Sequence, residues 1–225
     1  MGLKAEILAF HGWGFDCSAW SAWPLYLASF WQLQAFDRGY YGNSYDPVFS
    51  DPNARKIIFT HSYGLHLCPP RQLDFCDLLV IFSGFLHFHP QAPRLQGKSR
   101  LILQRMQEQF ALEPGAVMRR FMRRCYAPAP YQDHLNREFD RSRLAEDLRL
   151  LDHSKMAVTT LERARRVIIL HGSEDRIVPS SQGWALFDTL GPQALYHEIE
   201  GAGHALPFSH AQQCWAILEP ALRNL

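Results

Sequence analysis

Six short apolar runs recur along the chain, and each precedes a loop and a stretch with the composition of a helix. Most of these runs are apolar throughout rather than alternating with polar residues, which is typical of strands covered on both faces. They lie at residues 5–10, 33–36, 56–60, 78–83, 166–172 and 194–200. Because strands and helices alternate, the sequence predicts an α/β fold whose mainly parallel sheet has helices on both faces.

Helices are expected between the strands, but one long stretch departs from this alternation. The expected helices cover residues 18–29, 63–73, 154–164, 180–189 and 208–222. Residues 86–153, which we name the helical segment, contain no run resembling a strand. Three helices are predicted within it, at residues 101–112, 115–126 and 136–151. We expect the helical segment to form a cap, or lid, over one end of a core made of residues 1–85 and 154–225.

The composition is that of an ordinary globular protein and argues against several classes of function. With 225 residues, 47% of them apolar and 20% charged, the chain can bury one sizeable core. A formal net charge of +1 favours neither nucleic acid nor a membrane as a partner. The sequence has no G-x-G-x-x-G run, no phosphate-binding loop and no clustered metal ligands, so we expect no metal and no cofactor.

Cysteine usage and the chain start indicate a cellular location. The five cysteines are scattered without a C-x-x-C spacing, which argues against a disulfide framework or a zinc site and suits a reducing compartment. The first residues lack the long apolar stretch of a signal peptide, and the longest apolar run is too short to span a bilayer. We therefore expect a soluble cytoplasmic protein, with a monomer favoured.

Chemically reactive residues follow several of the predicted strands. Ser62 lies in the run T-H-S-Y-G after the third strand, Asp175 follows the fifth, and His204 follows the sixth. Loops at the carboxyl ends of parallel strands share one edge of the sheet, so these side chains can meet. A serine hydroxyl needs an imidazole to take its proton during attack, and the imidazole needs a carboxylate to fix its tautomer.

With serine, aspartate and histidine in this order, the chain resembles the α/β-hydrolases over nearly its whole length. The resemblance implies an α/β-hydrolase fold in which Ser62 is the nucleophile, Asp175 the acid and His204 the base. It also implies an oxyanion hole formed by two backbone N–H groups, those of Trp13 and Tyr63. Haloalkane dehalogenases and epoxide hydrolases of this fold need a carboxylate at the nucleophile position, which Ser62 excludes.

One residue departs from the family pattern, and several others could compete for these roles. The family has G-x-S-x-G around the nucleophile, whereas this chain has Thr60 in place of the first glycine. A small β-branched residue at a strand end is a strained but feasible substitution. Glu174 is a rival for the acid. Four further residues are predicted to be structural rather than catalytic, namely His11, His61, Ser83 and His210.

Two stretches indicate a substrate class. The runs HGWGFDCSAW (11–20) and HALPFSHAQQC (204–214) resemble the pimeloyl-[acyl-carrier protein] methyl ester esterases of biotin biosynthesis. That resemblance implies a serine carboxylesterase that hydrolyses an acyl methyl ester through an acyl-enzyme. Two alternatives remain open. One is a general small-ester hydrolase or thioesterase, and the other is a catalytically silent protein that uses the fold for binding.

The distribution of charge suits a carrier-bound substrate. Between Arg94 and Arg143 there are eleven lysines and arginines against five aspartates and glutamates, so the positive charge is concentrated in the helical segment. Acyl carrier proteins are strongly acidic, and a basic surface would speed and orient their approach. Six arginines are candidates for docking the carrier: Arg119, Arg120, Arg123, Arg124, Arg137 and Arg141. Five residues are candidates for an acyl pocket: Tyr40, Tyr41, Phe85, Phe88 and Met118.

Overall fold

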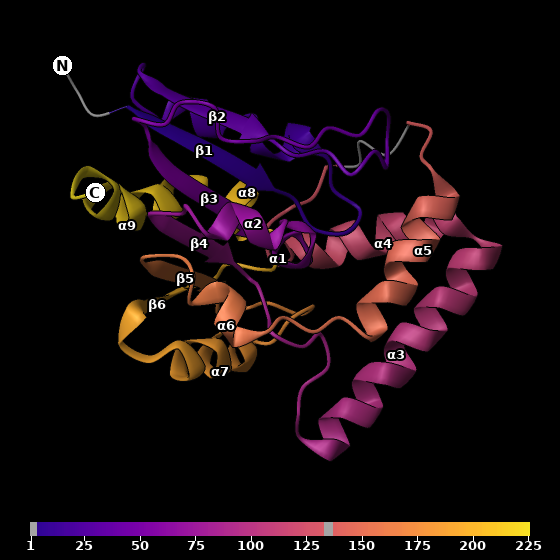
Figure 1. Cartoon of the computed structure of the whole chain (residues 1–225). Helices are drawn as coiled ribbons and strands as arrows, with labels where there is room; N and C mark the ends of the chain where they lie inside the picture. Colours follow the sequence, from indigo (N-terminus) through magenta and orange to yellow (C-terminus); the bar gives the residue numbers. More distant parts are fainter. Residues whose placement is uncertain (1–3, 133–136) are drawn as a thin grey trace.

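A single parallel sheet organises the molecule. The computed structural model describes residues 4–132 and 137–225 (Figure 1). Its six strands are ordered β2-β1-β3-β4-β5-β6, and every neighbouring pair is parallel. The strands are β1 (Ala5–Phe10), β2 (Trp31–Ala35), β3 (Arg55–His61), β4 (Leu78–Phe82), β5 (Val167–Gly172) and β6 (Ala194–Ile199). All six predicted strands are therefore present, and the α/β fold is confirmed.

The strand register decides which loops meet at the carboxyl edge of the sheet. Phe10 at the end of β1 pairs with Thr60 near the end of β3, so the loop that starts at His11 lies beside Ser62. On the other side of the sheet, Gly172 pairs with Ile199, which places the loops after β5 and β6 side by side. The strand order therefore places the loop after β1 beside the loop after β3, and the loop after β5 beside the loop after β6.

The two faces of the sheet explain why the strands are apolar throughout. Successive side chains of a strand point to opposite faces. In β1, Ile7 and Ala9 belong to one buried cluster, whereas Leu8 and Phe10 belong to another. Both faces are covered by helices, so both sets of side chains are removed from water.

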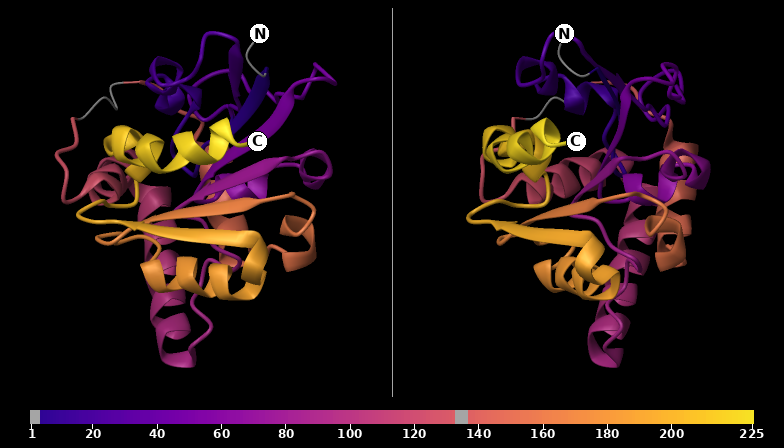
Figure 2. Two further views of the ribbon diagram at one scale, coloured as in Figure 1. Left: turned by 90° about the vertical axis from the view of Figure 1, so that its left-hand side faces the viewer. Right: turned by 60° about the vertical axis from the view of Figure 1, so that its left-hand side comes forward.

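Short helices cover the two faces. On one face lie the 3₁₀ turns at Cys17–Trp20 and Trp23–Leu25, α8 (Leu206–Ser209) and α9 (Ala211–Arg223). On the other lie α1 (Gly64–Leu67), α2 (Pro70–Leu73), α6 (Val158–Leu161) and α7 (Ser180–Leu190). Figure 2 shows α9 and α7 on opposite sides of β6.

Three predicted helices are much shorter in the structure. Residues 18–29 form only two 3₁₀ turns, and the second of them has Pro24 in its first turn. The expected helix at 63–73 is divided into α1 and α2 because Pro69 and Pro70 interrupt it. The expected helix at 154–164 is reduced to α6, which is four residues long.

The described part of the helical segment contains three helices: α3 (Pro93–Leu112), α4 (Pro114–Tyr126) and α5 (Arg141–Asp152). They lie beyond the carboxyl ends of the strands (Figure 1). The third was expected to begin at Asn136, which is outside the described residues, as are residues 1–3 of the predicted core. The division of the chain into a core and a cap stays a prediction.

The helices carry a further apolar cluster that joins the segment to the loops of the sheet. Met118, Met122 and Leu144 are buried together with Trp13 and Tyr63. No helix among the described residues has both the length and the apolar character needed to cross a membrane. The cytoplasmic location stays a prediction.

Candidate active site

The turn between β3 and α1 holds Ser62 in a strained backbone conformation. Ser62 has φ 54°, in the left-handed region that non-glycine residues rarely adopt, and its N–H donates to Phe82 O at 2.9 Å. Gly64 allows the chain to pass close to β1, since an added Cβ would lie 2.3 Å from Phe10 O. This is the backbone geometry that presents a serine side chain at the edge of a sheet.

Thr60 fits into this turn, and Ser62 keeps its left-handed backbone conformation. Its side chain is fully buried, and its hydroxyl donates to Val80 O of the neighbouring strand at 3.3 Å. The buried polar atom therefore has a partner. The threonine in the place of the first glycine does not prevent the turn from forming.

Ser62, His204 and Asp175 form one chain of hydrogen bonds. The Nδ1 of His204 is 2.8 Å from Asp175 Oδ2, and its Nε2 is 2.9 Å from Ser62 Oγ. A carboxylate only accepts, so Nδ1 carries the proton and Nε2 accepts the hydroxyl proton of Ser62. The three side chains, which are far apart in sequence, are brought together in the arrangement that general-base activation of a serine requires.

Asp175 is held as a carboxylate by several donors. Its Oδ1 accepts the N–H groups of Ile177 and Val178 at 2.8 and 2.9 Å, and His171 Nε2 lies 3.4 Å from Oδ2. Burial alone would raise the pKa of Asp175. The charge interaction with His204 and the hydrogen bonds from His171 and His204 outweigh burial, so the pKa lies well below its usual range. The carboxylate is therefore ionised and can orient the imidazole of His204.

The rival residues take other places. Glu174 is exposed and pairs with Arg176 at 3.7 Å, away from the imidazole. His61 donates from Nε2 to His204 O at 3.0 Å, and burial lowers its pKa well below the usual value, so it supports the backbone of His204 as a neutral ring. Ser83 also has a left-handed backbone, with φ 49°, but its buried Oγ has no hydrogen-bond partner among the described residues.

Two backbone N–H groups lie beside the serine without an acceptor of their own. Among the described residues, neither the Trp13 N–H nor the Tyr63 N–H donates to a protein acceptor. A Cβ added to Gly12 would lie 3.0 Å from Ser62 Cβ, so the loop that carries Trp13 is in contact with the serine. These are the positions expected for an oxyanion hole, and that role stays a prediction.

The predicted acyl-pocket residues gather in one apolar cluster with Trp13 and Tyr63. Tyr40, Phe85 and Met118 are fully buried, and Tyr41 and Phe88 are half-buried at its margin. One hollow of about 310 Å³ is lined by Phe49 and Lys56, and another of about 410 Å³ by Arg137 and Phe139, and none of the five predicted pocket residues lines either of them. The assignment of an acyl pocket to these five residues stays a prediction.

The predicted docking arginines are all exposed. The four on α4 have no acidic partner among the described residues. Arg124 instead donates from Nε to Arg176 O at 3.0 Å, in the loop of Asp175. Arg137 pairs with Asp16 at 2.7 Å and lies over the ring of Tyr41. Within the helical segment, Arg120 donates to Gln109 Oε1 at 3.1 Å, and Arg123 donates from Nε to Arg119 O at 3.4 Å. Arg124 and Arg137 are therefore the two that contact the loops of the sheet.

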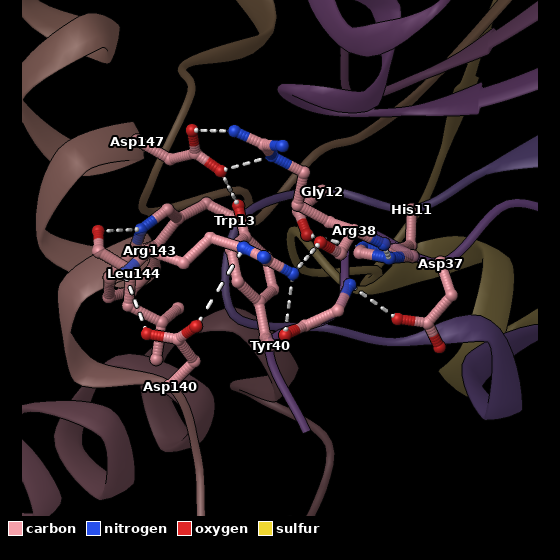
Figure 3. Close-up of polar contacts among 11 residues, drawn as sticks. His11, Gly12, Trp13, Asp37, Arg38, Tyr40, Asp140, Arg143, Leu144 and Asp147 are labelled. Carbon is pink, nitrogen blue, oxygen red and sulfur yellow. Dashed lines mark hydrogen bonds and ion pairs between the residues drawn. The ribbon is translucent and has the colours of Figure 1, made fainter. Parts of the chain in front are cut away.

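Sequence reasoning missed three residues that support the site. His171 contacts Asp175, and its signal was present at the start of the run HGSEDRIVP. Arg38 lies in the polar loop after β2 and pairs with Asp147 of α5 (Figure 3). Nothing in the sequence distinguished Asp147 from the other carboxylates of its helix, because tertiary contacts determine which side of the helix is buried.

The described residues contain no group of three or more His, Cys, Asp or Glu side chains arranged to hold a metal ion.

Comparisons with known proteins define the fold. No family model matches the chain, and a comparison with curated proteins also found no match. Solved structures do match. A hydrolase from Oleispira antarctica is 17% identical with a TM-score of 0.79, covering 100% of this chain and 93% of its own. A thermophilic esterase from Thermogutta terrifontis is 17% identical with a TM-score of 0.76, covering 100% and 91%.

The same fold also carries other chemistry. A bromoperoxidase from Bacillus anthracis is 16% identical with a TM-score of 0.71, covering 99% of this chain and 93% of its own. Since one fold hosts several activities, function must be argued from the site. With its six parallel strands, its covering helices and these structural neighbours, the chain has the α/β-hydrolase fold.

Proposed function

We propose that the protein is a serine carboxylesterase. The observation that carries this proposal is the continuous set of hydrogen bonds from Ser62 through His204 to Asp175, with distances of 2.9 and 2.8 Å. The left-handed backbone of Ser62 supports it further, because strain of this kind persists where the surrounding structure enforces it. Structural neighbours that are themselves esterases or hydrolases are consistent with the proposal.

The reaction follows from the geometry. His204 Nε2 takes the hydroxyl proton of Ser62 as Oγ bonds to the ester carbonyl carbon, and the carbonyl oxygen becomes an oxyanion facing the N–H groups of Trp13 and Tyr63. The carbon–oxygen bond to the alcohol then breaks, and His204 gives its proton to the departing alcohol. Water attacks the resulting acyl-enzyme with His204 as the base, which releases the acid and restores Ser62.

A fluorophosphonate probe tests whether the serine is activated. The wild-type protein should be labelled at Ser62, whereas Ser62→Ala and His204→Ala should lose both labelling and ester hydrolysis, with kcat lower by about 10⁶-fold. Ser83→Ala is the matched control, since Ser83 shares the left-handed backbone but does not contact His204. Absence of labelling from the wild type would favour a catalytically silent binding protein, and labelling that survives in His204→Ala would mean that His204 does not activate Ser62.

We further propose that the substrate is a carrier-bound acyl methyl ester, most specifically pimeloyl-[acyl-carrier protein] methyl ester. The motifs HGWGFDCSAW and HALPFSHAQQC support this substrate by their resemblance to the esterases of biotin biosynthesis. The exposed arginines of α4 support an acidic carrier as the partner. Arg119 and Arg123 are one helical turn apart, exposed, and without acidic partners among the described residues.

Reversal of charge on α4 tests carrier docking. The double change Arg119→Glu with Arg123→Glu should lower kcat/KM for the carrier-linked methyl ester by about tenfold or more, because rim charges steer association. Hydrolysis of a soluble short-chain ester should stay close to wild type.

The control for this prediction has the same change in net charge at a different place. Arg165→Glu with Arg166→Glu alters two exposed arginines at the amino end of β5, opposite the carboxyl edge that holds Ser62. It should affect neither substrate. If the α4 variant lost activity on both substrates equally, the basic surface would not be a docking site, and a general small-ester hydrolase or thioesterase would be favoured.

A further inference from the structure

A buried carboxylate of α5 joins the helical segment to the loop after β2. Asp147 is fully buried and accepts three hydrogen bonds (Figure 3). Arg38 donates to it from Nε and from Nη2, both at 2.8 Å, and Tyr40 donates from its hydroxyl at 2.7 Å. Paired hydrogen bonds between an arginine and a carboxylate are strong and directional, so the backbone of Arg38 is held relative to α5.

The backbone of Arg38 in turn holds the loop beside the serine. The Arg38 N–H donates to His11 Nε2 at 3.1 Å, which requires His11 to carry its proton on Nδ1. The protonated Nδ1 donates to Gly12 O, at a distance of 2.9 Å between nitrogen and oxygen. Burial lowers the pKa of His11, and the neutral ring is the form that can accept from Arg38 and donate to Gly12.

The carbonyl of Gly12 and the N–H of Trp13 belong to the same peptide group. A trans peptide is planar, and its C=O and N–H point in opposite directions. A hydrogen bond that fixes Gly12 O therefore also fixes the direction of the Trp13 N–H, which is the predicted oxyanion donor. The side chain of Trp13 adds a second attachment to α5, because its Nε1–H donates to Leu144 O at 2.9 Å.

We infer that Asp147 and Arg38 are positioning residues for the oxyanion hole, acting through His11 and the Gly12–Trp13 peptide. This inference rests on the proposed esterase function. A donor for the oxyanion acts mainly in the transition state, when negative charge develops on the carbonyl oxygen. A tilt of the Gly12–Trp13 peptide should therefore weaken binding of the tetrahedral state more than binding of the ester.

Asp147→Asn removes the charge but keeps the side-chain size, and two inhibitors measure its effect. Ser62 Oγ adds to the carbonyl carbon of an alkyl trifluoromethyl ketone, and the serine proton passes to His204. The carbonyl oxygen becomes an oxyanion in the predicted oxyanion hole. The unfluorinated methyl ketone of the same chain length binds without this addition. We expect Asp147→Asn to weaken the fluorinated inhibitor and to lower kcat, each by about tenfold. Binding of the methyl ketone and KM should change little.

Asp152→Asn is the matched control on the same helix. Asp152 accepts from His89 Nε2 at 2.8 Å, within the helical segment, and does not contact the loop after β1. This variant should leave both inhibitors and kcat unchanged. Tyr40→Phe removes one of the three hydrogen bonds to Asp147, so it should lower kcat and binding of the fluorinated inhibitor by a smaller factor. It takes the place of Asp147→Asn if that variant does not fold.

The outcomes separate this inference from the proposed function. If the wild type binds the fluorinated ketone no better than Ser62→Ala does, the esterase proposal fails and this inference fails with it. Suppose instead that the wild type binds the fluorinated ketone tightly, but the folded Asp147 and Tyr40 variants bind both ketones equally less well, or bind both as well as the wild type does. The proposed function then stands, and the positioning role is overturned. A selective loss of the fluorinated inhibitor in these variants, and not in Asp152→Asn, supports it.

Discussion

Replacement of Asp175 by asparagine should lower kcat for ester hydrolysis roughly 10⁴-fold, with little change in KM. Asparagine has nearly the same shape, but its amide can donate to His204 Nδ1, which would then lose its proton to Nε2. A protonated Nε2 faces Ser62 Oγ as a donor rather than an acceptor, so the hydroxyl proton has no base. Steady-state kinetics with a soluble ester at neutral pH measure this loss.

Glu174→Gln is the control for Asp175→Asn. Glu174 is the neighbouring carboxylate, but it is exposed and pairs with Arg176, so its removal should leave kcat within about twofold of wild type. A large loss in Glu174→Gln together with a small loss in Asp175→Asn would mean that the hydrogen bond between Asp175 and His204 does not orient the base.

Gly64→Ala should destabilise the protein by about 3 kcal/mol or more and abolish hydrolysis. The added Cβ would lie 2.3 Å from Phe10 O and 2.7 Å from His11 O, and both are backbone atoms that no change of rotamer can move. The turn and the end of β1 would have to separate, which displaces Ser62 from the loop that carries Trp13. Urea unfolding of the variant and the wild type, monitored by circular dichroism, gives the difference in free energy of unfolding.

Gly97→Ala provides a control with the opposite sign. Gly97 lies in α3, is exposed, and has nothing within 4 Å of an added Cβ. Alanine loses less backbone entropy on folding than glycine, so this change should stabilise the protein by about 0.5–1 kcal/mol. An equally stable Gly64→Ala variant would show that the turn tolerates a side chain at this position.

The sheet was predictable because each of its strands depends on local sequence. Strands buried on both faces are apolar throughout, so the runs at β1, β3, β4 and β5 could be recognised directly. The assignment of Ser62, Asp175 and His204 rested on the resemblance to the α/β-hydrolases, and their side chains lie within hydrogen-bond distance of one another in the structure. The match with α/β-hydrolase structures confirms this fold.

Other parts depended on contacts that no local pattern contains. The helix expected at residues 18–29 became two 3₁₀ turns, whose Trp20 and Trp23 are buried against the sheet. Asp147 meets Tyr40 from 107 residues away, and such pairing is fixed only when the helical segment packs on the loops. Thr60 could be recognised as a departure from the pattern, but its bond to Val80 O required the neighbouring strand.

The attachment of α4 limits how the helical segment can be exchanged. Ala205, which follows His204, donates its N–H to Cys125 O of α4, and Arg124 reaches Arg176 beside Asp175. Replacing residues 86–153 to alter specificity would remove these hydrogen bonds from both the loop of His204 and the loop of Asp175. A productive graft must therefore retain a backbone acceptor for the Ala205 N–H and a side-chain donor for Arg176 O, so residues 86–153 cannot be exchanged independently of the loops that carry His204 and Asp175.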